Sequence, residues 1–422
     1  LVAYSCERDE RAPASSVKAS PAAEHFPGAV PKNAEVLSDQ AISLDLTRVR
    51  WQGTGLYVPA GSVVTIRLGA EDAARGLVAQ VGCHTDKLWD KPNWQRVPDV
   101  VYRVPLDRTT VEFASAFGGL LYIDNPRRSD ASCLLRVDGA VRSPRFVLGV
   151  TTPDEWRTVL REAPGPWAEL ESRKVVVSVP SEEIRTLDDP TNVMKFWDSI
   201  SDAHATLGGI PLERDWPWRF VADVQISAGY MHSGYPIMTH LDAAKDMVSV
   251  QNLRAGCWGL LHELGHNHQE PEWTFAGTGE VTCNVFALHA IDTVCTPVPG
   301  DRGHGGVNKP PSVRKHIETG RDFERWKSDP FLALQFYIML EEAFGWEVYK
   351  RVFAEYRDLQ KEERPRTDDE KRDQWLIRFS RACGRNLGPY FVAWGIPVSE
   401  RAKAAVSDLP GWMPEEWPGG TQ

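Results

Sequence analysis

The segment GLLHELGHNHQEPEWTFAGTGEVTCNVF, residues 259–286, carries two histidines four positions apart and a glutamate further along the chain. Residues four apart lie on one face of an α-helix, so His262 and His266 can point at a common position. The run Gly-Thr-Gly at 277–279, followed by an apolar stretch, predicts a loop that turns into a second helix with Glu280 in its first turn. The segment therefore predicts two helices that meet at a cluster of two imidazoles and a carboxylate.

These residue types suit a catalytic zinc site. The motif His262-Glu263-Leu264-Gly265-His266 has the pattern His-Glu-x-x-His, in which both histidines can bind one ion at about 2.0–2.1 Å. Glu280 is the expected third ligand, which leaves one coordination position open for water. Zn²⁺ lowers the pKa of such a water, and Glu263 is placed to accept the proton from it as general base.

Other side chains in the segment compete for these roles. Asn284 lies four residues after Glu280, on the same helix face, and can hydrogen-bond a ligand from behind. His268 is a candidate fourth ligand of a purely structural site, but its spacing from the motif points it elsewhere on a helix. Glu270 and Glu272 are rival third ligands, although they follow too closely for the chain to turn back. Two satisfied core histidines are the plain alternative, but burying the intervening glutamate without a cation is costly.

Outside this segment the chain changes from linker-like to strand-like to helical patterns. Residues 1–37 are rich in Ala, Pro and Ser without an apolar period, so we expect a flexible linker or a leader remnant. Short strand-like runs separated by turns occupy 38–150 and predict an antiparallel β-sandwich domain. Buried strands and long helical periodicities fill 151–422, which we interpret as the catalytic domain. The expected fold class is α+β, with an N-terminal antiparallel β-sandwich followed by an α/β and helical domain.

Composition limits the partners. The 422 residues carry a formal net charge of −10, so the chain has no electrostatic footprint for nucleic acid or an anionic membrane. No stretch of 18 apolar residues predicts a transmembrane segment. The seven cysteines include no CxxC pair, which argues against a cysteine zinc site. The run LVAYSC makes Cys6 a candidate lipid-attachment residue, with a trimmed leader as the alternative.

Longer motifs throughout the chain resemble one family. The segment HELGHNHQ is followed by WTF and then by GTGEVTCN. Further matching motifs are TGLYVPAGSVVTI at 54–66, VGCHTD at 81–86, ASAFGGLLYID at 114–124, DVQISAGYMHSGYPIM at 223–238, ALQFYIMLEEAFGWEVYKRVFAEYR at 333–357 and FVAWGIPVS at 391–399. On these residues the chain resembles the enhancin-like zinc metallopeptidases, which include bacterial mucin-degrading O-glycopeptidases. The resemblance covers about residues 40 to 417.

The resemblance implies a gluzincin-type catalytic unit behind a β-sandwich. It implies His262, His266 and Glu280 as zinc ligands and Glu263 as general base. It also implies a substrate class, O-glycosylated mucin-like glycoproteins, and an enzyme that is secreted or held at the cell surface. We expect a monomer with Zn²⁺ as its cofactor, a glycoprotein as substrate and no nucleic-acid partner.

Four side chains are candidates for substrate contact. The stretch ISAGYMHSGYPIM, 226–238, can form a strand that pairs with a substrate backbone. Tyr230, His232 and Tyr235 would then face the substrate or stabilise the oxyanion of the reaction, and an ordinary loop is the alternative. Trp273, between the expected ligands, can stack on a sugar ring or only pack its own loop.

Two other functions stay open. A general metallopeptidase without glycan dependence would differ only in its substrate pocket. A non-catalytic glycan-binding or protein-binding module is a different class, since some eukaryotic relatives act as partner-regulating proteins. The intact motif argues against that class, because a pure binder has no need of Glu263.

Cys257 and Cys283 depart from the family pattern and either pack or pair with each other.

Overall fold

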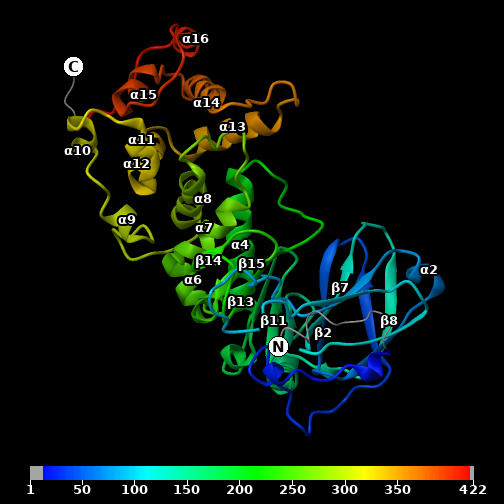
Figure 1. Cartoon of the computed structure of the whole chain (residues 1–422). Coiled ribbons are helices and arrows are strands. Elements are labelled where there is room, and N and C mark those ends of the chain that lie inside the picture. The colour runs from blue at the N-terminus through cyan, green and yellow to red at the C-terminus, as the bar shows by residue number, and fades with distance from the viewer. Residues whose placement is uncertain (1–12, 419–422) are drawn as a thin grey trace. The chain divides into compact units, whose positions relative to one another are not determined.

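The computed structural model of the chain describes residues 13–418 (Figure 1). The chain divides into two compact units. The first, here called the strand-rich unit, runs up to Asp198 and also includes Glu213–Val250. The second, here called the helical unit, comprises Ser199–Leu212 and the chain from Gln251 onward. This division differs from the predicted domains 38–150 and 151–422, whose boundaries stay a prediction.

The strand-rich unit contains an antiparallel β-sandwich. Its two sheets have the strand orders β1-β8-β3-β6 and β5-β4-β7-β2-β9. On β8, Cys133, Leu135 and Val137 are buried while the residues between them face outward, which is the alternation that a half-buried strand requires. The α+β fold class with its expected antiparallel sandwich is thereby confirmed. The strands are β1 (Gln40–Asp45), β2 (Arg50–Val58), β3 (Val63–Arg67), β4 (Val78–Val81), β5 (Tyr102–Pro105), β6 (Thr110–Ala114), β7 (Gly119–Asn125), β8 (Ser132–Asp138) and β9 (Val141–Arg142).

A six-stranded mixed sheet completes this unit, with the order β10-β11-β12-β13-β15-β14. Strands β12, β13 and β15 run parallel to one another, whereas β11 and β14 are antiparallel to their neighbours β12 and β15. Every residue of β13 is buried, as expected for a central strand covered on both faces. The strands are β10 (Arg145–Val147), β11 (Trp167–Glu171), β12 (Val175–Pro180), β13 (Trp218–Asp223), β14 (Met231–His232) and β15 (Ile237–His240).

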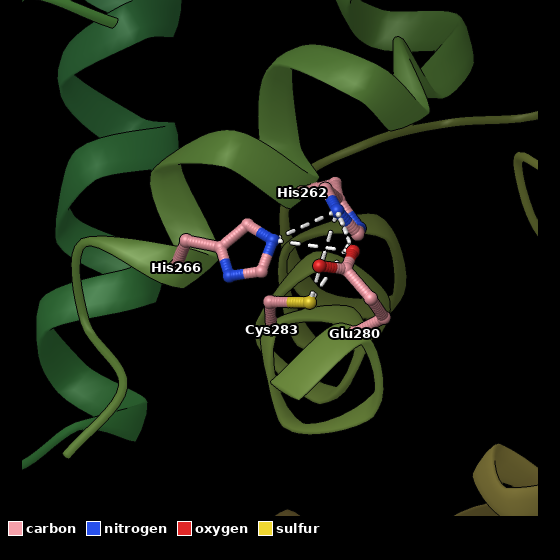
Figure 2. A group of neighbouring side chains, drawn as sticks. All are labelled: His262, His266, Glu280 and Cys283. Atoms are coloured by element: carbon pink, nitrogen blue, oxygen red, sulfur yellow. Dashed lines mark hydrogen bonds and ion pairs between the residues drawn. The ribbon is translucent and has the colours of Figure 1, made fainter. Parts of the chain in front are cut away.

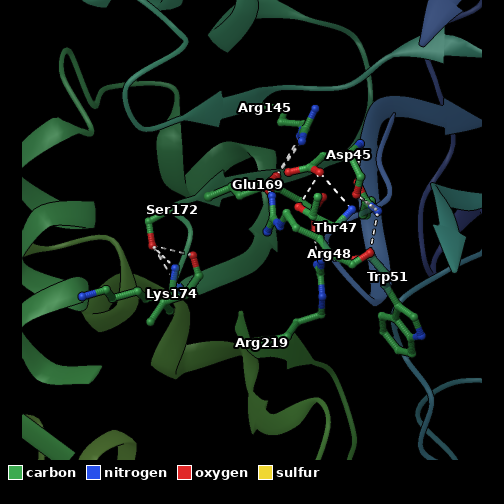
Figure 3. A network of polar contacts seen from close by, with 12 residues as sticks. Asp45, Thr47, Arg48, Trp51, Arg145, Glu169, Ser172, Lys174 and Arg219 are labelled. Atoms are coloured by element: carbon green, nitrogen blue, oxygen red, sulfur yellow. Dashed lines mark hydrogen bonds and ion pairs between the residues drawn. The ribbon is translucent and has the colours of Figure 1, made fainter. Parts of the chain in front are cut away.

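A network of buried charges lies in the strand-rich unit (Figure 3). Glu169 on β11 is paired with Arg219 on β13. Two residues along β11, Glu171 contacts Arg48 at 2.8 Å and Arg145 at 2.6 Å. Both carboxylates are almost completely buried. A buried carboxylate is costly unless it is paired, so these contacts favour a single register of the strands that carry them.

The helical unit packs its helices around an aromatic core. Local signals define the helix ends: Asp329 caps α12 ahead of Pro330, and Thr367 with Glu370 forms a capping box at the start of α14. The longer helices of this unit are α7 (Trp258–His266), α8 (Gly279–Thr293), α12 (Pro330–Phe344), α13 (Trp346–Arg357) and α14 (Asp368–Cys383). Helix α4 (Thr191–Leu207) belongs to the strand-rich unit up to Asp198 and to the helical unit from Ser199. The shorter helices of this unit are α6 (Val250–Gly256, from its second residue on), α9 (Gly305–Asn308), α10 (Val313–Glu318), α11 (Phe323–Ser328), α15 (Gly388–Trp394) and α16 (Glu400–Ala404). Three further short helices belong to the strand-rich unit: α2 (Ala70–Ala73), α3 (Pro153–Thr158) and α5 (Ala244–Met247).

Part of the predicted linker is packed onto the strand-rich unit. Phe26 is buried there. The indole N–H of Trp167 donates to the carbonyl of Pro27 at 2.7 Å, and the hydroxyl of Tyr57 donates to the carbonyl of Gly28 at 2.9 Å. The prediction of a flexible linker is wrong for residues 26–28. The side chain of Phe26 packs into an apolar site, and amino-acid composition does not reveal such a contact.

Two further predictions concern attachment to a membrane. Within residues 13–418, no helix is both long enough and apolar enough to cross a membrane. Cys6, the candidate for lipid attachment, lies outside the described residues.

Candidate metal centre

Two helices of the helical unit bring the expected ligands together (Figure 2). His262 and His266 lie on α7, and Glu280 is the second residue of α8. The helices approach closely at Gly265, where a Cβ atom would lie 2.4 Å from the carbonyl oxygen of Cys283. Only a glycine allows this approach, so the glycine of the motif sets how near α8 comes to the two histidines.

The donor atoms have the spacing of a metal site. The Nε2 atoms of His262 and His266 lie 3.0 Å apart, and Glu280 Oε2 lies 3.2 Å and 3.4 Å from them. Ligand atoms placed tetrahedrally at 2.0–2.1 Å from one ion are separated by about 3.3 Å. The imidazoles are mostly buried, whereas 63% of the Glu280 side chain is exposed, so the cluster is open to solvent on its carboxylate side.

Two amide side chains fix the orientation of the imidazoles. Asn284 Oδ1 lies 2.6 Å from His262 Nδ1, and Gln269 Oε1 lies 2.7 Å from His266 Nδ1. The amide nitrogens donate in turn to backbone carbonyls, Asn284 to that of Glu280 and Gln269 to that of Gly279, both at 2.7 Å. Since each amide oxygen can only accept, both histidines donate from Nδ1 and present a bare Nε2 lone pair to the cluster.

The cluster therefore gathers three acceptors, two imidazole lone pairs and a carboxylate, around one point. Such a set is unfavourable unless a cation or a proton sits among them. Hydrogen bonds with His262 and His266 hold the pKa of Glu280 well below its usual range. Burial acts to lower the pKa of His266, but its contacts with Glu280 and Gln269 outweigh burial and raise it. A proton on His266 and a metal ion are thus alternative ways to satisfy the same carboxylate.

Cys283 completes the group of potential metal-binding side chains but is oriented differently. Its buried Sγ lies 3.6 Å from His262 Nδ1 and 3.9 Å from Nε2, so it packs beside the ring at nearly equal distance from the two nitrogens. We therefore assign it a packing role and leave the fourth coordination position open. The sulfur of Cys257 contacts the carbonyl of Asn252, and the two cysteines are not bonded to each other.

Glu263 lies in the chain between the two histidines and is largely buried. Its negative charge acts, after Glu280 and Gln269, to raise the pKa of His266. A carboxylate in this position can exchange a proton with a molecule bound at the centre without being one of the three ligands.

The rival ligands have other partners. His268 is buried, and its Nδ1 contacts the carbonyl of Leu264 at 2.8 Å. Glu270 pairs with Arg357 at 2.6 Å, and Glu272 pairs with Arg364 at 3.1 Å. None of the three belongs to the cluster found among residues 13–418. Gln269 was missed by the sequence analysis, although its position three residues after His266 on a helical turn was a usable signal.

Trp273 does not offer a surface to a sugar. Its side chain is fully buried, with its ring centroid 4.6 Å from that of Phe353 and 5.6 Å from that of Tyr356. The prediction that Trp273 binds substrate is contradicted by this burial, and the packing alternative is correct. A tryptophan in a loop between ligands looks the same in sequence whether its ring faces solvent or a neighbouring helix.

The other three substrate-contact candidates lie in the strand-rich unit. Tyr230 is 53% exposed and stacks on His240. His232 on β14 contacts a carboxylate oxygen of Asp86 at 2.7 Å. Tyr235 packs edge-on against Trp51 and Trp216, and the guanidinium of Arg50 lies 4.3 Å from its ring centre. Of the three, Tyr230 has the most ring surface open to a ligand, and their role stays a prediction.

Comparison with protein families identifies the family of this chain. Residues 139–395 match the family described as Peptidase M60, enhancin and enhancin-like. The chain belongs to this family. Residues 34–135 match the N-terminal domain of M60-like peptidases, so the two matches cover the sandwich, the mixed sheet and the metal centre. The resemblance to the enhancin-like family is thereby confirmed.

Relatives of this M60-family chain include longer proteins. It is 38% identical over 374 residues to TRPM8 channel-associated factor 1 of Bos taurus, covering 87% of this chain and 40% of that relative. A conserved protein of unknown function from Bacillus anthracis shares the fold with a TM-score of 0.72, 22% identity and coverage of 90% of this chain and 80% of that one. IMPa from Pseudomonas aeruginosa, solved with an O-glycopeptide, has a TM-score of 0.66, 18% identity and coverage of 90% and 52%.

Proposed function

We propose that this chain is a zinc-dependent endopeptidase that cleaves O-glycosylated, mucin-like glycoproteins. The observation that carries the proposal is the convergence of His262, His266 and Glu280 at a spacing that suits tetrahedral ligands of one ion. Two imidazoles and one carboxylate with an open fourth position form the ligand set of a catalytic rather than a structural zinc. Glu263 beside this set supplies the base that hydrolysis needs.

The proposed reaction is hydrolysis of a peptide bond. Zn²⁺, when bound, supplies a Lewis acid that acidifies water and polarises a carbonyl group. Glu263 accepts a proton from the attacking water as the water oxygen bonds to the carbonyl carbon. Glu263 then delivers that proton to the amine nitrogen as the carbon–nitrogen bond breaks. Asn284 and Gln269 keep the imidazoles oriented throughout, so no ligand has to reorganise during the reaction.

The substrate class rests on family membership and on a structural neighbour. IMPa, which shares the fold, has been solved in complex with an O-glycopeptide. We propose that Tyr230, His232 and Tyr235 contact the substrate here, with the exposed ring of Tyr230 as the candidate surface for a sugar. We further propose an enzyme that acts as a monomer after secretion or at the cell surface, where such glycoproteins occur.

A binding role is the second candidate, and one observation favours it. The relative named TRPM8 channel-associated factor 1 shares 38% identity over 87% of this chain, and its name describes association with a channel. In this candidate function the chain would bind a membrane protein without cutting it. The complete ligand set and Glu263 favour hydrolysis, because binding alone requires neither.

Digestion of a mucin-type glycoprotein tests the proposal. Zinc-loaded protein would be incubated with an O-glycosylated mucin and with the same mucin after enzymatic removal of its glycans. We expect cleavage of the glycosylated form alone, lost with a chelator and in Glu263→Gln. The matched control is Glu318→Gln, an exposed glutamate of α10, which should cleave like the wild type.

The outcomes separate the candidates. Equal cleavage of both mucins would replace the glycopeptidase proposal with a general peptidase. One bound zinc per chain without cleavage of either mucin would favour the binding role.

A further inference from the structure

A glycine-rich loop places His304 beside the motif helix. The loop has the sequence Arg-Gly-His-Gly-Gly at 302–306. The His304 ring stacks on Phe331, with ring centroids 4.5 Å apart and an interplanar angle of 5°, and lies 5.4 Å from the ring of Trp258. Trp258 is the first residue of α7 and precedes His262 by four positions, so the two share one face of that helix. His304 is therefore close to the face of α7 that carries the metal ligands.

The glycines around His304 hold the loop against its neighbours. At Gly306 a Cβ atom would lie 2.5 Å from the ring of Phe331, and at Gly303 it would lie 2.6 Å from Ile291. Gly303 also has a φ of +83°, a conformation that other residues rarely adopt. The loop can pack this tightly on α8 and α12 only because these positions lack side chains. The close packing of this loop consequently restricts the His304 imidazole to one orientation.

The hydrogen bonding of His304 identifies its tautomer. The backbone N–H of Gly306 donates to His304 Nδ1 at 2.9 Å. A neutral imidazole that accepts at Nδ1 carries its proton on Nε2, so the other nitrogen is a donor. Burial lowers the pKa of His304, which favours this neutral form. Across residues 13–418, no hydrogen-bond partner of that Nε2–H is found.

We infer that His304 contacts the substrate at the metal centre, presenting its Nε2–H to the carbonyl oxygen of the bond to be cut. The inference deepens the proposed function and rests on it. Asn284 and Gln269, the amide side chains of the centre, are already used to orient the metal ligands, whereas His304 has a donor to offer. Its proton stays on Nε2 throughout, while Glu263 carries the proton from water to amine. A pre-oriented donor stabilises the negative charge that develops on the carbonyl oxygen.

Two substitutions separate the donor from its packing. His304→Phe keeps an aromatic ring against Phe331 but removes both nitrogens, and His304→Gln keeps an amide that can donate and accept. For zinc-loaded protein on an O-glycosylated mucin peptide, we expect His304→Phe to lower kcat by about 100-fold with KM nearly unchanged. His304→Gln should recover part of that loss, and zinc content should be unchanged in both. The matched control, His25→Phe at an exposed histidine of the strand-rich unit, should behave like the wild type.

A binding measurement tests the inference without turnover. An N-phosphoryl peptide has a tetrahedral anionic group that resembles the reacting carbonyl, and its affinity for zinc-loaded protein can be measured by calorimetry. We expect binding to His304→Phe to be roughly tenfold weaker than to the wild type. Equal affinity in the two proteins would overturn the role of His304 even if the wild type cleaves mucin. Cleavage absent in a wild type that binds the N-phosphoryl peptide would instead overturn the proposed function, and absence of binding to the wild type would overturn both.

Discussion

Glu280 belongs to the cluster of potential ligands and Glu263 does not, so the two carboxylates have different chemistry. Glu280 Oε2 lies within 3.4 Å of both histidine Nε2 atoms, whereas Glu263 is buried beside the ligands. Replacing a ligand should remove the metal, and replacing the base should leave it in place.

We therefore expect Glu280→Gln to lose bound zinc and Glu263→Gln to retain one zinc per chain. Peptide cleavage by Glu263→Gln should fall by about 10²–10⁴-fold, the usual contribution of a general base. Zinc content by elemental analysis, measured beside a cleavage assay, checks both outcomes. Loss of zinc from Glu263→Gln would assign that carboxylate to the ligand set instead.

The amides that orient the imidazoles lead to a second prediction. Asn284→Ala and Gln269→Ala each remove an acceptor from a histidine Nδ1. Loss of such an outer partner commonly weakens metal affinity by about 10–100-fold, and we expect that range for each. Competition with a chelator of known zinc affinity measures it. An unchanged affinity in both variants would mean that the imidazoles are oriented by their own helix alone.

At the scale of elements, the spacing between α7 and α8 decides whether the centre forms. Gly265 is where a Cβ would meet the carbonyl of Cys283 at 2.4 Å. Because backbone cannot move aside as a flexible side chain can, Gly265→Ala must push α8 away from α7 and carry Glu280 with it.

We expect Gly265→Ala to lower both the zinc affinity and the midpoint of thermal unfolding. Gly279→Ala is the matched control, since a Cβ at that first position of α8 would meet nothing within 4 Å. Metal titration and thermal unfolding of the two variants provide the comparison. Equal zinc affinity for Gly265→Ala and the wild type would show that the approach of the helices is not what positions Glu280.

At the scale of the whole molecule, the charges buried in the strand-rich unit make stability depend on pH. Burial alone would raise the pKa of Glu171, but the charges of Arg145 and Arg48 lower it to about 2. The ordinary value is 4.5, so as pH falls the unfolded chain takes up a proton before the folded one does. The stabilisation is therefore complete above about pH 4.5 and is lost as pH falls towards 2.

Each unit of pKa corresponds to about 1.4 kcal/mol, so protonation of Glu171 should remove about 3 kcal/mol of unfolding free energy over this range. Denaturant unfolding between pH 7 and pH 3 measures the slope for the wild type. Glu171→Gln should be less stable at pH 7, because it leaves two arginines without their partner, and less sensitive to acid. Equal pH slopes in the two proteins would contradict the prediction.

The sequence by itself determined the parts of this protein that depend on local spacing. Histidines four apart on an apolar helix share a face whatever surrounds them, so it was predictable that His262 and His266 point at one position. Alternating apolar residues in short segments separated by turns, such as TGLYVPAGSVVTI at 54–66, made the sandwich predictable for the same reason. The longer motifs placed the chain in its family.

Only the tertiary structure decided which side chains meet across elements. Trp273 faces the core because Phe353 and Tyr356, some eighty positions along the chain, pack against it. The Nε2 lone pairs of the two histidines are bare because Asn284 and Gln269 accept from their Nδ1 atoms. These amides are oriented by hydrogen bonds to backbone carbonyls, which the spacing of residues in the sequence does not reveal. His304 reaches α7 because its glycines allow a close approach to helices formed elsewhere in the sequence. Local periodicity determines the face on which a residue lies, but the partner that the face meets depends on how the whole unit packs.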